Sequence, residues 1–142
     1  MRSTARIACV LAPLIAGAGM VCDLAGEGVY TLLLAGHTAP EGAAVAAAAQ
    51  IERFTALQRL GTLLCAGAAN GLYTAAGVLL TLATPALPGG IRGAMWLTWA
   101  AGAALSAGAI AASTTLMATA TAILFPAFIL WTVWMAWRWR VP

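Results

Sequence analysis

The sequence predicts an all-α integral membrane protein, a four-helix bundle, and three observations support this fold class. Of the 142 residues, 63% are hydrophobic and only 8% are charged, whereas a soluble domain carries about 25% charged residues. The mean hydropathy is +0.93, and the apolar residues gather into long runs with short polar segments between them. A chain of this length has room for about four spans of roughly 20 residues. Because a backbone in hydrocarbon must satisfy its hydrogen bonds internally, we expect four helices in a single transmembrane domain, 1–142.

The first span follows two arginines, Arg2 and Arg6, and resembles a secretory signal peptide with small residues at positions 16–18. Apolar sequence continues past that point through Cys22, so a first transmembrane helix is expected rather than a cleaved leader. The predicted spans are, in order, residues 7–27, 56–82, 93–112 and 116–137.

The connections between the spans differ in character. The interval His37–Gly42 contains Pro40 and predicts a turn. Residues 43–60 then read as an Ala-rich amphipathic helix that runs without a break into the second span, which predicts a helical extension between helices 1 and 2. Residues 84–90 are rich in Pro and Gly and predict a loop, and a turn is expected near Ser113.

Two kinds of residue predict the orientation. If both termini share a side of the membrane, five arginines fall there, and Arg53 and Arg59 fall on the other side. An excess of arginine marks the cytoplasmic side, so the termini are expected in the cytoplasm and the helical extension outside it. The same topology brings all six tryptophans to the cytoplasmic interface, where indoles favour the headgroup region. These are Trp96, Trp99, Trp131, Trp134, Trp137 and Trp139.

Ionisable side chains within the spans are costly and therefore suggest function. Asp23 and Glu27 stand four residues apart on one helical face, which continues through Gly19 and Ala16. Small residues permit close approach of another helix, so the two carboxylates are expected to face inward. Arg59 enters the second span at the same depth, and we predict that it pairs with Asp23, Glu27 or both.

A single stripe on the long second helix adds further polar groups to this region. It carries Arg59, Asn70 and Tyr73 at helical spacing. The predicted polar intramembrane cluster therefore comprises Asp23, Glu27, Tyr30, Arg59, Asn70 and Tyr73. In one interpretation these groups only fix the register of helices 1 and 2. In the other, a carboxylate without a full partner takes up a proton or binds a cationic solute.

Several chemistries lack support in the sequence. His37 is the single histidine, and Cys9, Cys22 and Cys65 have no metal-ligand spacing, so neither a metal site nor a cofactor is predicted. No motif of a hydrolase, a zinc protease or a phosphate-binding loop is present. The arginines are spread along the chain and form no basic face for nucleic acid. An enzyme is the least supported class.

Three functional hypotheses remain for this multi-pass protein of the cell (inner) membrane. The leading one is a self-associating or accessory subunit of a larger membrane assembly, because small-residue seams are more abundant than one bundle needs. The alternative is a small oligomeric transporter or channel-like protein that uses Asp23, Glu27 and Arg59. A membrane enzyme or binding protein for a lipid or quinone is the second alternative. One seam on the third span could pack within the bundle or between protomers: Thr98, Gly102, Ser106, Ala109 and Ser113.

Overall fold

A computed structural model describes the whole chain except residues 1–2, 36–43, 85 and 139–142, and every regular element in the described part is helical. Four helical stretches are long and apolar enough to cross a membrane, which confirms the predicted all-α class with four helices. The elements are α1 (Ser3–Ala35), α2 (Ala44–Thr62), the π-helix η1 (Leu63–Ala69), α3 (Asn70–Ala83), α4 (Gly89–Ile110) and α5 (Thr114–Arg138).

The observed helices are longer than the predicted spans. The first helix continues through Pro13 to Ala35 without interruption, and the third span starts at Gly89 rather than after Arg92. The segments α2, η1 and α3 follow one another as one uninterrupted helical rod, the second rod of the molecule. The predicted turn at His37–Gly42 lies outside the described residues, as does Trp139.

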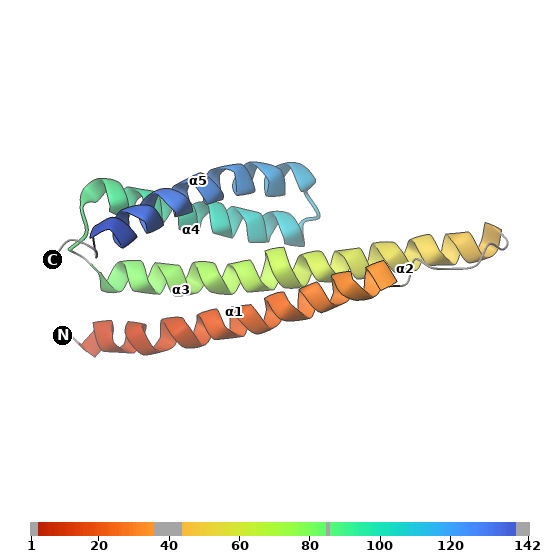
Figure 1. Ribbon diagram of the computed structural model, residues 1–142, viewed down its shortest axis with the longest axis horizontal. Coiled ribbons are helices and arrows are strands. Elements are labelled where there is room, and N and C mark those ends of the chain that lie inside the picture. Colours follow the sequence, from red (N-terminus) through yellow and green to blue (C-terminus); the bar gives the residue numbers. More distant parts are fainter. Residues whose placement is uncertain (1–2, 36–43, 85, 139–142) are drawn as a thin grey trace.

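The helices pack in sequence rather than around a common centre. The α1 helix lies along α2, η1 and α3, the α4 helix packs against η1 and α3, and α5 packs against α4 (Figure 1). The start of α1 and the end of α5 lie at the same end of the molecule, and the first part of α2 projects beyond the other helices at the opposite end (Figure 1). Within the described residues, no packing of similar extent joins α1 to α5.

Glycines bring α1 close to the second helical rod. A Cβ on Gly19 would lie 2.8 Å from the Tyr73 ring, and one on Gly26 would lie 2.3 Å from the Cys65 Sγ. From the other side, Gly61 receives the Tyr30 ring in the same way, at 2.8 Å. Each glycine therefore accommodates a side chain of the neighbouring helix, which is the small-residue packing expected in a membrane.

The α3–α4 contact also packs side chains on glycines, and each of the two helices contributes both a glycine and a side chain. The Trp99 indole lies directly on Gly77, and the Thr74 side chain lies on Gly102. Gly102 and Ala109 are buried, and Ser106 bonds to α3. The seam predicted on the third span is therefore used, at these positions, inside the protein.

The α4 helix ends in a Schellman motif. The Ser113 N–H donates to the carbonyl of Gly108 at 2.9 Å, and the Ala112 N–H donates to that of Ala109 at 3.3 Å. Ala112 has a φ of 54°, a left-handed conformation that a glycine usually provides at this position. This turn confirms the connection expected near Ser113 and places it beside Arg59 (next section).

Candidate functional site

Arg59 binds the end of α4 and not the carboxylates of α1. Its guanidinium donates from Nη2 to the carbonyl of Ile110 at 2.6 Å and from Nη1 to the carbonyl of Ala109. Carbonyls in the last turn of a helix have no partner within the helix and carry its partial negative charge. The guanidinium, a planar cation with several hydrogen-bond donors, supplies the missing donors and a compensating positive charge. Arg59 is therefore a side-chain cap of α4.

This arrangement corrects the predicted pairing of Arg59 with Asp23 or Glu27. The Cys65 thiol lies 3.7 Å from the Asp23 carbonyl oxygen, which places Asp23 at the level of Cys65. Cys65 follows Arg59 by six residues, or about 9 Å along the helix. Moreover, Arg59 points toward α4, whereas Cys65 points toward α1. Depth and direction both separate the guanidinium from Asp23.

The two carboxylates of α1 also differ from each other. Asp23 is half-buried against the second rod, where its carboxylate lies near the Tyr73 hydroxyl and the Cys65 thiol. Glu27 is exposed on the surface of the chain, and its carbonyl accepts a hydrogen bond from the Thr31 hydroxyl. Asp23 thus faces inward as expected, whereas Glu27 is exposed in the single chain but still lies within electrostatic range of the Cys65 thiol.

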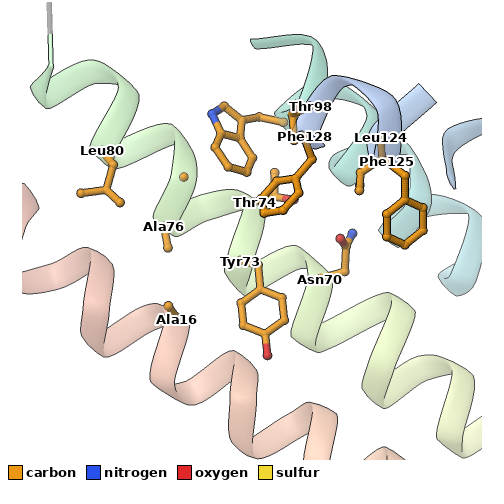
Figure 2. Close-up of a pocket in the computed structure, with 12 residues that line it drawn as sticks. Ala16, Asn70, Tyr73, Thr74, Ala76, Leu80, Thr98, Leu124, Phe125 and Phe128 are labelled. Atoms are coloured by element: carbon orange, nitrogen blue, oxygen red, sulfur yellow. The ribbon is translucent and has the colours of Figure 1, made fainter. Parts of the chain in front are cut away.

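Tyr30 and Tyr73 belong to the α1 interface. The Tyr30 hydroxyl is 3.2 Å from the Thr62 hydroxyl, and its ring covers Gly61. The Tyr73 ring covers Gly19, and its hydroxyl points toward α1 (Figure 2). The structure therefore brings Asp23 and Tyr73 together and leaves Tyr30 one to two turns away, in a contact of its own.

Asn70 connects α3 to α4 near the middle of the helices. Its Nδ2 donates to the Gly102 carbonyl at 2.6 Å and to the Ser106 Oγ at 2.9 Å. The carbonyl of Gly102 can only accept, so these bonds assign the amide nitrogen to the α4 side. Asn70 is therefore a link between helices, which was one of the roles expected for a polar residue at this depth.

Sequence reasoning placed Thr81 on an interior stripe of the second span but did not predict its hydrogen bond with Trp99. Thr81 is fully buried; its hydroxyl donates to the Gly77 carbonyl at 2.8 Å and accepts from the Trp99 Nε1, also at 2.8 Å. The Trp99 ring meets Trp131 edge-on, with 5.9 Å between the ring centroids. Trp99 is thus half-buried, in contact with Thr81 and Trp131. The signal was the helical alignment of Gly77 with Thr81.

A cavity of about 450 Å³ lies between the α1–α3 pair and the α4–α5 pair. Aromatic and aliphatic side chains form most of its wall, and Asn70 lies between Tyr73 and Phe125 at its edge (Figure 2). The volume falls within the ~300–1,000 Å³ typical of small-molecule sites. The wall residues are Ala16, Asn70, Tyr73, Thr74, Ala76, Gly77, Leu80, Thr98, Trp99, Leu124, Phe125 and Phe128.

Two of the polar wall residues form hydrogen bonds within the protein. The Thr98 hydroxyl donates to the Ala94 carbonyl at 2.9 Å, and the Asn70 amide nitrogen bonds to α4. Among the described residues, no group of three or more His, Cys, Asp or Glu side chains could hold a metal ion. The cavity is suited to an apolar molecule and poorly suited to a hydrated ion.

Comparison with known proteins identifies no relative: no protein-family description, no curated protein and no solved structure matches this chain. Arguments about function therefore depend on the geometry described above.

Proposed function

We propose that the protein is a self-associating membrane subunit that acts through contacts between its helices and those of a second copy. The observation that supports this proposal best is an exposed face of small residues on α4. Its members are three or four residues apart, and each is exposed in the single chain: Ala100, Ala103 and Ala107 of α4 and its C-cap residue Ala111. Such a face lets two backbones approach closely, which drives helix association in lipid.

The serial packing of the helices also supports association. The α5 helix packs against α4, and α1 packs against the second rod. Most of the surface of α1 and α5 is therefore exposed in the single chain. Only 11% of the most apolar window of α5 is buried in the single chain. A second copy would cover part of this surface without any rearrangement of the fold.

The transport alternative receives less support from the same residues. A pathway needs polar groups that remain available to a solute. Arg59 uses its guanidinium to cap α4, and the Asn70 amide nitrogen is bonded to α4. Asp23 retains a half-buried carboxylate, but the cavity beside α3 is lined mainly by apolar groups.

The proposal includes an orientation in a cell membrane. Both termini lie in the cytoplasm, the projecting part of α2 lies on the opposite side, and Arg59 lies at that outer boundary. Its support is the distribution of arginines along the sequence, together with the position of the start of α1 and the end of α5 at one end of the molecule (Figure 1).

The test is the oligomeric state of an Ala103→Ile variant, measured by native mass spectrometry of protein released from detergent micelles. A branched side chain at Ala103 holds the two α4 backbones apart, so we expect the dissociation constant of the oligomer to rise by at least about tenfold. Ala136→Ile adds the same side chain at another exposed alanine, on α5, and is the matched control. A monomeric wild-type protein, or equal dissociation of the two variants, would contradict the proposal.

A further inference from the structure

The amide of Asn70 brings to the wall of the cavity between the two helix pairs a polar acceptor without a partner among the described residues. The Nδ2 of Asn70 is fixed toward Gly102 and Ser106, which turns the Oδ1 of the same amide away from α4. Among the residues that the structure describes, none donates a hydrogen bond to this oxygen. Figure 2 shows the amide between Tyr73 and Phe125, at the cavity. An amide oxygen in hydrocarbon loses free energy unless a donor reaches it.

The size of the cavity limits what can occupy it. One turn of α-helix, about 10 Å across and 5.4 Å long, fills roughly 400 Å³. The cavity, at about 450 Å³, is therefore close in volume to a single helical turn. A small molecule or a single hydrocarbon chain fits this volume.

The chemistry of the wall limits the occupant further. Leu124, Phe125 and Phe128 of α5 face Leu80 of α3 across the space, and no charged side chain is among the wall residues. An ionic headgroup inside the cavity would have no counter-charge and would be excluded by its desolvation cost. An apolar body with one neutral donor matches both the wall and the free Asn70 Oδ1.

We propose that this cavity binds a membrane-soluble hydrocarbon that carries a hydroxyl group, and that the hydroxyl donates a hydrogen bond to the Oδ1 of Asn70. The molecule enters sideways from the bilayer, between α1 and α5, where the two helices lack extensive contact. Either a straight acyl alcohol or a branched isoprenoid alcohol has the required chemistry. The site is separate from the α4 alanine face, so it does not depend on self-association.

The first experiment compares two probes on the wild-type protein. Dodecan-1-ol and dodecyl methyl ether have similar chains, but only the alcohol can donate a hydrogen bond. Native mass spectrometry is performed in an amine-oxide detergent, whose headgroup has no donor to compete. We expect one alcohol molecule per protomer, bound about fivefold more tightly than the ether. Equal binding of the two probes would overturn the role of Asn70.

The second experiment fills the cavity. Ala16 lies in the wall, facing Ala76 (Figure 2), and Ala16→Leu places a larger side chain there. Ala18→Leu makes the same change at an exposed position of α1 outside the wall. We expect Ala16→Leu to weaken alcohol binding at least about tenfold and Ala18→Leu to leave it unchanged; equal binding by both variants refutes the location of the site. If Ala16→Leu does not fold, as judged by its thermal unfolding, the proposal is tested by the comparison of dodecan-1-ol with dodecyl methyl ether on the wild-type protein.

Farnesol provides a third arm that distinguishes the two sources of the alcohol. Its branched, unsaturated chain is about as long as that of dodecan-1-ol. Tighter binding of farnesol assigns the site to isoprenoid alcohols, and tighter binding of dodecan-1-ol assigns it to acyl alcohols. Failure of both probes to bind rejects the site, and leaves the oligomer measurement on Ala103→Ile to be judged separately.

Discussion

The substitution Gly77→Ala tests the packing that positions α4 on α3. A Cβ at this position would lie 2.4 Å from two carbons of the Trp99 ring and 2.6 Å from a third. The ring cannot move away freely, because Nε1 bonds to the Thr81 hydroxyl at 2.8 Å and the ring edge packs on Trp131. The variant must therefore displace a constrained indole or separate the two helices.

The expected cost follows from these contacts. Overpacking costs about 1–3 kcal/mol, and displacement of the indole loses a hydrogen bond worth about 0.5–1.5 kcal/mol. The intrinsic helix preference of Ala over Gly, about 1 kcal/mol, offsets part of this. Gly28→Ala is the matched control, because nothing lies within 4 Å of a Cβ on Gly28 and only the helix preference acts there. We expect Gly77→Ala to be less stable than Gly28→Ala by about 2–4 kcal/mol.

The assay is reversible unfolding of the detergent-solubilised protein by a denaturing detergent, followed by far-UV circular dichroism. A double-mutant cycle with Trp99→Leu identifies the source of the effect. If the indole causes the clash, Gly77→Ala costs much less when residue 99 is already small. Equal stability of the two Gly→Ala variants, or an equal cost in both backgrounds of residue 99, would refute the reasoning.

Two further substitutions test the polar contacts in the same unfolding assay. Arg59→Met removes both guanidinium bonds to the α4 carbonyls and should destabilise the protein by about 1–3 kcal/mol. The control Arg53→Met, at an exposed position of α2, should change the stability by less than about 0.5 kcal/mol. Similar effects of the two changes would show that Arg59 does not cap α4. Thr81→Val leaves the Trp99 N–H without its acceptor and should cost about 1–3 kcal/mol, with a change in near-UV circular dichroism. Thr55→Val, which loses only a bond within its own helix, serves as the control, and an equal loss in both threonine variants would argue against the indole contact.

Composition and hydropathy were sufficient to predict the helical class. The four apolar runs became four helices of membrane-spanning length. Residues 43–60 contain neither Pro nor Gly, in keeping with the uninterrupted rod α2–η1–α3. Boundaries were less certain, because Gly89 and Gly90 start α4 inside a segment that reads as a loop. Both glycines lie in the first turn of α4, directly after the N-cap Pro88.

The partners of the polar residues could be predicted only in part. Helical spacing placed Arg59 and Asn70 on one face of the second rod, and both do contact α4. Helical spacing does not show which neighbouring helix that face contacts. When only side chains are considered, a carboxylate is the obvious partner of an arginine. The true acceptors are backbone carbonyls, present at every helix end and invisible in a list of residue types. Asp23 instead lies near Tyr73 and Cys65, which are on a different face of the second rod from Arg59.

The hairpin of α4 and α5 is held to the rest of the protein at both of its ends. At one end the chain itself continues from α3 into α4 around Pro88, and at the other the Arg59 guanidinium binds the last carbonyls of α4. Such a hairpin cannot swing outward about a single hinge; it can only bow in the middle. The width of the gap beside Asn70 therefore depends on how far α4 and α5 bend between these two attachments.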